Sequence, residues 1–293
     1  MSGSVMVLLA AIGFGFNPLF AQILFAQGMK VEMVTLCRFI LPGLLLSFYL
    51  RTPRTLWPEM RRMLMIGFVN AIGVLLYFYA LQTLSPATAI LIYYTYPFFS
   101  LLIGILAFKR SLSVNALLSA VLVLIAASLV IEPSQLSMAS KWALLGCFLA
   151  PIVFAFQIQY LAKPKQNLTA LSRMAWGTMG HLVVLIPLAV CTSPEVAFPH
   201  EINGWWALLG LAFLAAALPQ YLFVMGAVNT KPEVIAILGA VELVVAMLSC
   251  ALFLGQALTR LDITAMLLVI VALGIRDPKP ITMKREVAKS VVI

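Results

Sequence analysis

Ten long apolar runs most constrain what this 293-residue chain folds into. Each approaches the roughly 20 residues that an α-helix needs to cross the hydrocarbon core of a bilayer. Only short connections separate them, so we expect no water-soluble domain between the spans. The runs cover residues 5–26, 32–50, 63–82, 87–108, 113–131, 142–162, 169–191, 205–227, 233–254 and 261–275.

The composition agrees with a membrane environment. Hydrophobic residues make up 63% of the chain and charged residues 10%, whereas a soluble protein carries about 25% charged residues. One soluble core of this size does not bury so much apolar surface. Soluble enzymes, disordered chains and disulfide scaffolds are therefore disfavoured. The run 5–26 lacks a basic segment before it and exceeds a signal peptide's apolar core, so we expect a retained first span.

Basic residues show a strong bias between the two sides of the predicted spans. With the N-terminus inside, 14 of the 19 Lys and Arg residues fall on the inner side. The three on the outer side are Lys30, Lys141 and Arg260. Because Lys and Arg are enriched in cytoplasmic loops, we expect both termini in the cytoplasm and the protein in the inner or plasma membrane. The basic segment 276–293 lacks aromatic residues and is predicted to be a cytoplasmic tail, not a nucleic-acid site.

The two halves of the chain resemble each other. With an offset of 146 residues, the stretch 106–113 aligns with 252–259, and Tyr96-Pro97 aligns with Glu242-Leu243. With an offset of 135, Arg38 aligns with Arg173.

Each half holds five predicted spans. Because five is odd, the second half enters the membrane in the opposite orientation, as in the inverted repeats of secondary transporters. We therefore predict an all-α membrane protein of ten transmembrane helices. Its repeats would be residues 1–131 and 132–275.

Segments 96–131 and 242–275, with the stretch 78–91 and the two early arginines, resemble the EamA-type branch of the drug/metabolite transporter superfamily. This resemblance implies a ten-helix inner-membrane carrier, and such proteins commonly export amino acids or related metabolites.

The sequence departs from the family pattern at three positions. Arg110 and Gln256 stand where the family often has glutamate, which puts a charge-based gating role of those positions in doubt. Leu243 replaces a frequent proline, so a continuous ninth helix is expected.

Glu242 is the one acidic residue far from a predicted span end. Its helical neighbours Gly239, Ala246 and Ser249 form a small, polar face, which indicates that the carboxylate points into the bundle. It is our candidate for binding a substrate amine and for coupling to protons. The alternative is permanent pairing with polar groups on another helix.

Other polar groups at membrane depth are candidate substrate-binding residues. The first and sixth spans, which are repeat-equivalent, both carry a proline near mid-membrane, a feature typical of transporter sites. The tyrosines would stack on an apolar substrate, or simply pack in the bundle. The amides would contact substrate or bond other helices. The candidates, besides Glu242, are Asn17, Asn70, Tyr77, Tyr93, Tyr96, Gln157 and Gln220.

Arg38 and Arg173 are predicted to be gate or interface anchors that extend toward opposite membrane surfaces. Direct substrate binding by them is the less favoured interpretation. His181 is interpreted as a packed structural residue.

A secondary transporter that exports amino acids or similar metabolites is the leading hypothesis. Drugs and nucleotide-sugar-type metabolites are alternative substrates, and a receptor or scaffold is the non-transport alternative. We expect no enzyme, metal or cofactor, because the sequence contains no HExxH motif, no paired aspartates and no Cys/His metal spacing. The expected partners are a small-molecule substrate, the lipid bilayer and, for coupling, protons. The oligomeric state stays open.

Overall fold

The computed structural model describes residues 2–84, 86–107, 114–129, 138–161, 167–192 and 198–275. Helices joined by short turns form this part of the chain, and it contains no β-strand. The first half comprises α1 (Gly3–Phe14), α2 (Asn17–Ala26), α3 (Val31–Leu46), the 3-10 turns η1 (Ser47–Leu50) and η2 (Arg54–Leu56), α4 (Trp57–Thr83), α5 (Pro86–Tyr93), α6 (Tyr96–Leu106) and α7 (Val114–Leu129). The second half comprises α8 (Met138–Cys147), α9 (Leu149–Leu161), α10 (Ala170–Thr192), α11 (Ile202–Leu209), the π-helix η4 (Gly210–Ala217), α12 (Leu218–Ala227), α13 (Pro232–Gly239), α14 (Val241–Leu254) and α15 (Arg260–Gly274).

Within the described ranges, seven helical stretches are long and apolar enough to cross a membrane, which makes this an integral membrane protein. They are Gly3–Ala26, Val31–Leu50, Arg54–Thr83, Trp142–Tyr160, Ala170–Thr192, Ile202–Ala227 and Ile237–Leu254. The runs 87–108, 113–131 and 261–275 contain shorter helices, so the count of ten crossings stays a prediction.

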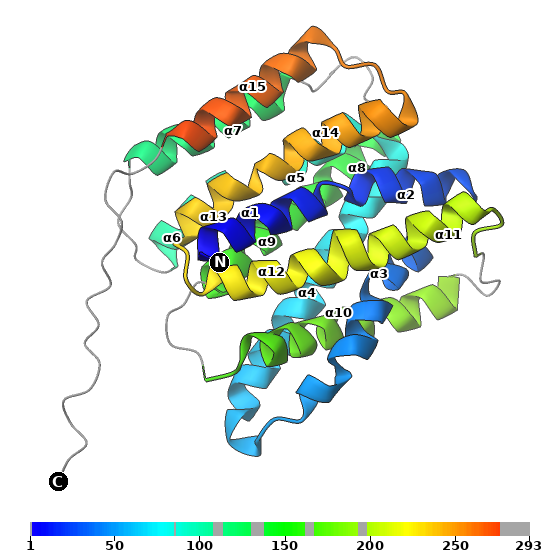
Figure 1. Ribbon diagram of the computed structural model, residues 1–293, viewed down its shortest axis with the longest axis vertical. Coiled ribbons are helices and arrows are strands. Elements are labelled where there is room, and N and C mark those ends of the chain that lie inside the picture. Colours follow the sequence, from blue (N-terminus) through cyan, green and yellow to red (C-terminus); the bar gives the residue numbers. More distant parts are fainter. Residues whose placement is uncertain are drawn as a thin grey trace.

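The helices align so that successive turns alternate between two ends of the bundle (Figure 1). At one end the Lys30 ammonium donates a hydrogen bond of 2.9 Å to the carbonyl of Thr192. At the other end the Glu59 carboxylate accepts three hydrogen bonds, from the side chain and backbone of Asn167 and from the backbone of Leu168. Figure 1 places the N-terminus and the end of α15 at the same end of the bundle. The predicted tail, 276–293, lies outside the described residues.

Proline positions coincide with several breaks in the helices. Pro18 follows the break between α1 and α2, Pro97 follows that between α5 and α6, and Pro151 follows that between α8 and α9. Pro219 is the second residue after the end of the π-helix η4. Because proline lacks the backbone N–H of a regular turn, such breaks are expected close to it.

The expectation of a continuous ninth helix is wrong. The helix divides at Ala240, between α13 and α14, although leucine occupies position 243. Tight turns cause the break: the Ala240 N–H bonds the Ile237 carbonyl, and the Leu243 N–H bonds the Ala240 carbonyl. The Tyr96 hydroxyl lies where a Cβ on Gly239 would be, so the glycine permits this close approach. A kink here needs no proline.

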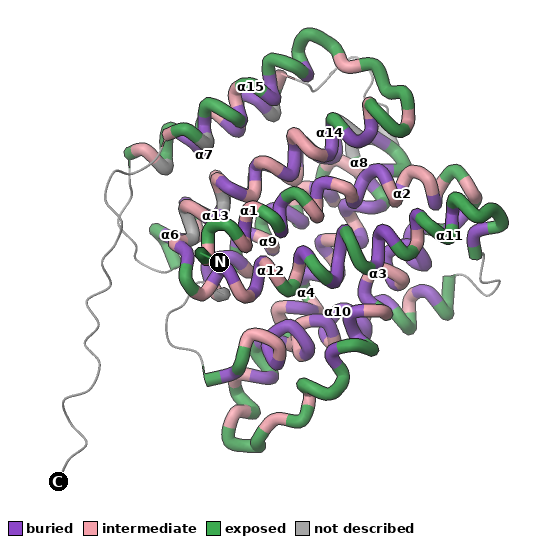
Figure 2. Tube along the Cα trace, viewed as in Figure 1, coloured by how far each residue is buried: buried purple, intermediate pink, exposed green. Residues whose placement is uncertain are grey.

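Glycines set the closest crossing between the two halves of the chain. A Cβ on Gly67 of α4 would overlap the Gly177 backbone of α10, and one on Gly180 would overlap the Leu64 carbonyl. Small residues let membrane helices approach in this way. Buried residues follow the inner faces of these helices, whereas α7 and α15 are exposed along much of their length (Figure 2).

Candidate substrate-binding site

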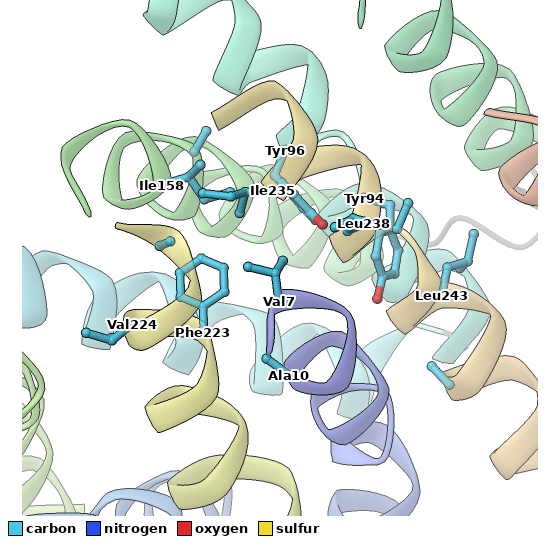
Figure 3. Packing of buried hydrophobic residues seen from close by; sticks show 14 of the residues in the cluster. Val7, Ala10, Tyr94, Tyr96, Ile158, Phe223, Val224, Ile235, Leu238 and Leu243 are labelled. Atoms are coloured by element: carbon cyan, nitrogen blue, oxygen red, sulfur yellow. The ribbon is translucent and has the colours of Figure 1, made fainter. Parts of the chain in front are cut away.

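A narrow cavity lies between the halves, inside the bundle. Its volume is about 10 Å³, the space of roughly one water molecule. Figure 3 shows Val7 of α1 and Phe223 of α12 on the side of the cavity opposite Tyr96 of α6. The full lining is Val7, Ala11, Phe14, Tyr96, Phe154, Phe223, Gly239 and Glu242. The walls are therefore mostly aromatic and aliphatic, with one carboxylate and one phenol.

Glu242 stands in the first turn of α14, directly after the break at Ala240. The residue is buried, with 9% of its surface exposed. Its carboxylate accepts a hydrogen bond from the Tyr94 hydroxyl and interacts electrostatically with Arg38. The helix break thus places the candidate carboxylate beside the cavity and in the neighbourhood of the half-buried Arg38.

Four tyrosines and a phenylalanine form an aromatic cluster next to the cavity. The ring centroids of Tyr77 and Tyr93 lie 5.2 Å apart, and those of Tyr93 and Tyr96 lie 5.7 Å apart. Phe154 contacts both Tyr93 and Tyr96, at 5.6 and 5.0 Å. Tyr94 joins the cluster at 5.9 Å from Tyr96. Three predicted site tyrosines, Tyr77, Tyr93 and Tyr96, are therefore brought together.

Residues that the sequence repeat relates to one another lie close together in this region. The 146-residue offset relates Tyr96 to Glu242 and Tyr93 to Gly239. In the structure Tyr96 contacts Gly239, and its repeat counterpart Glu242 lies near Tyr93. Large side chains of the first half thus face small or charged residues of the second half.

Asn70 and Gln157 are occupied by a network that joins three helices. The Asn70 amide nitrogen donates a hydrogen bond of 2.7 Å to the Gln157 side-chain oxygen. The Asn70 oxygen lies 3.0 Å from the His181 Nε2, and the His181 Nδ1 lies 2.8 Å from the Gly177 carbonyl. The network holds α4, α9 and α10 together, and the histidine ring stacks on Phe39 at 4.0 Å.

Asn17 has a local role beside the first helix break. In a regular helix, the backbone N–H of residue 18 would bond the Phe14 carbonyl, but Pro18 has none. The Asn17 amide nitrogen replaces this donor, 2.8 Å from the Phe14 carbonyl oxygen. The Asn17 oxygen is buried without a hydrogen-bond partner.

Gln220 and Arg173 lie outside the described cavity lining. Gln220 is half-buried on α12, where Phe223 is the residue that lines the cavity. Arg173 is buried at the start of α10 and interacts electrostatically with Tyr160 and Glu59.

Arg38 points into the bundle, so the prediction that it extends to the outer surface is wrong. Its guanidinium carbon lies 5.9 Å from the Phe14 ring, 5.5 Å from the Phe39 ring and 5.9 Å from the Phe78 ring. These distances are those of cation–π contacts. The rings come from three different helices, which no span-by-span interpretation of the sequence reveals.

Sequence reasoning also missed several cavity residues. Phe14, Phe154 and Phe223 line the cavity, and Tyr94 bonds Glu242. Gln159, two residues after Gln157 on α9, donates a hydrogen bond of 2.7 Å to the Ser100 carbonyl. The repeat offered a signal for Phe223, because the 146-residue offset aligns it with the predicted site residue Tyr77.

The described residues contain no group of three His, Cys, Asp or Glu side chains able to hold a metal ion. The cavity lining can therefore bind a ligand through aromatic stacking, hydrogen bonds and the Glu242 carboxylate.

Comparison with known proteins identifies the family. The sequence pattern of the EamA-like transporter family matches residues 1–132 and again 141–275. The chain belongs to the EamA-like transporter family. Members of this family are membrane transporters of small molecules, so a small-molecule substrate and a lipid bilayer are its partners.

The fold has relatives among solved structures. One, titled "Crystal structure of protein", superposes with a TM-score of 0.74 at 14% sequence identity, over 93% of this chain and 95% of the other. At this identity the likeness shows the fold alone. No curated protein sequence matches the chain.

Proposed function

We propose that this EamA-like protein exports amino acids or related small metabolites by alternating access. In this proposal the repeats 1–131 and 132–275 form ten transmembrane helices, five in each inverted half. The protein lies in the inner or plasma membrane with both termini in the cytoplasm, as the bias of its basic residues suggests.

The carrying observation is Glu242, a buried carboxylate that lines an aromatic cavity between the two repeats. A carboxylate binds the ammonium group of an amino acid, and the rings of Phe154 and Phe223 provide surface for an apolar side chain. Charged groups inside membrane bundles commonly mark substrate or proton pathways. The same carboxylate is our candidate for proton coupling.

Two structural features support inverted repeats. Ser119, near the start of α7, donates a hydrogen bond of 3.1 Å to the Ala272 carbonyl near the end of α15, so these repeat-equivalent helices run antiparallel. The repeat-equivalent helices α6 and α14 also run in opposite directions in Figure 1. Inverted repeats of this kind allow the halves to exchange conformations around a fixed site.

Counterflow in proteoliposomes tests the proposal. Wild-type protein is expected to exchange radiolabelled L-phenylalanine, and a panel of unlabelled amino acids then ranks the competitors. Glu242→Gln should lose most of this exchange and its pH dependence. Glu32→Gln is the matched control, because Glu32 is also buried but lies at the end of α3 that contacts Tyr79, outside the described cavity lining.

Two results count against the proposal. Unchanged exchange and pH dependence in Glu242→Gln would remove this residue from the mechanism. Folded wild-type protein that exchanges none of the amino acids would contradict the substrate class.

A further inference from the structure

Arg38 is a half-buried cation whose side chain makes no hydrogen bond in the described part of the chain. Its Nε is buried without a partner, and no hydrogen bond or ion pair to this side chain occurs within the described ranges. The three phenylalanine rings around it attract the cation but offer no acceptor oxygen.

A guanidinium in this state is an incomplete site. It presents five N–H donors in a planar fork; the Nε–H is buried and unpaired, although buried donors are nearly always paired. Carboxylates match this fork with two parallel hydrogen bonds. Glu242 does not serve this purpose here: it interacts with Arg38 only at longer range, and the Tyr94 hydroxyl bonds its carboxylate.

The sequence repeat relates residues near Arg38 to residues that line the cavity. Tyr77 and Tyr93 both lie near Arg38. The offset of 146 relates them to Phe223 and Gly239, which line the cavity. In the position beside Arg38 that the repeat relates to the cavity, the rings of Tyr77 and Tyr93 fill the space, with their centroids 5.2 Å apart.

We propose that Arg38, with Tyr77 and Tyr93, forms an anion subsite that takes the carboxylate of the substrate while Glu242 binds its ammonium group. This inference rests on the proposed function and makes the substrate class more specific. The transported molecule is a zwitterion with an apolar or aromatic body. Amines without a carboxylate bind only the Glu242 side.

Competition binding separates the two charged groups of the substrate. The full-length protein in nanodiscs binds radiolabelled L-phenylalanine, and two analogues compete with it. L-phenylalaninamide lacks the carboxylate, and 3-phenylpropionate lacks the ammonium group. Wild-type protein should prefer L-phenylalanine to both by about tenfold or more, because each comparison removes a charge-assisted hydrogen bond.

Arg38→Gln should weaken L-phenylalanine binding about tenfold or more and leave L-phenylalaninamide within about twofold of wild type. Glu242→Gln should do the reverse, weakening the amide and sparing 3-phenylpropionate. If Arg38→Gln does not fold, Arg38→Lys carries the test: it keeps the charge, loses the planar fork, and should weaken L-phenylalanine more than the amide.

Equal weakening of L-phenylalanine and its amide by the Arg38 variants would overturn the subsite and indicate a structural role. Wild-type protein that binds the amide as well as the amino acid would also overturn it, yet leave transport of amines standing. Wild-type protein that binds none of the three probes contradicts both the subsite and the proposed amino-acid substrate.

Discussion

The crossing of α4 and α10 supplies two glycines at one contact whose substitution should act in opposite directions. A Cβ on Gly67 would point into the Gly177 backbone, 2.7 Å from its carbonyl carbon. A Cβ on Gly177 would meet no atom within 4 Å. Both glycines lie inside helices, so Gly67→Ala and Gly177→Ala make the same chemical change in the same kind of backbone.

The magnitudes follow from two opposing effects. Alanine in place of a helical glycine stabilises by about 1 kcal/mol. Overpacking typically costs about 1–3 kcal/mol, and the upper part applies at Gly67 because the obstacle is backbone that does not rotate away. We therefore expect Gly67→Ala to destabilise by about 2 kcal/mol and Gly177→Ala to stabilise by up to about 1 kcal/mol.

Equilibrium unfolding of the purified variants in mixed micelles measures both free energies against wild type. A Gly67→Ala variant as stable as Gly177→Ala would refute this account of the crossing, since no clash would then be present. A loss of stability in both would mean that flexibility of the glycines, not close approach, determines the effect.

The hydrogen bonds around the helix breaks and between helices give two more predictions. Asn17→Leu should destabilise by about 1–2 kcal/mol, because the Phe14 carbonyl loses its donor; adding Pro18→Ala restores a backbone N–H and should recover much of the loss in the same unfolding assay, whereas no recovery would rule out this role. Asn70→Leu should destabilise by about 1–3 kcal/mol, because it breaks the bonds to Gln157 and His181. In a double-mutant cycle with Gln157→Leu the losses should be less than additive, and strict additivity would contradict the network.

Much of the architecture was predictable from apolar length and periodicity. The helices begin and end near the predicted run boundaries, and prolines marked the breaks beside Asn17 and between α8 and α9. The ninth helix was mispredicted because the reasoning relied on proline alone, whereas close packing of Gly239 on Tyr96 accompanies the break at Ala240.

The candidate site could be predicted from the sequence where the internal repeat related its residues to one another. The repeat pairs Tyr96 with Glu242, and the structure places both on one cavity. The amides of Asn17, Asn70 and Gln157 were recognisable as polar groups at membrane depth. Their partners were not, because these depend on which helices face each other across the bundle.

Arg38 illustrates the same limit. Depth in the membrane suggested a side chain extending to the interface, but the rings of Phe14 and Phe78 arrive from other helices and hold it inside. A long basic side chain follows the most favourable contact, and only the tertiary structure shows where that contact lies.

The central claim is that substrate passes through the cavity between the halves, and a blocked cavity tests it most directly. Ala11 of α1 lines the cavity and is buried, whereas Leu9 of the same helix is 41% exposed on the outer face. Counterflow of L-phenylalanine should be abolished in Ala11→Trp and retained in Leu9→Trp, with both proteins folded by size-exclusion chromatography. Undiminished counterflow in folded Ala11→Trp would contradict the claim.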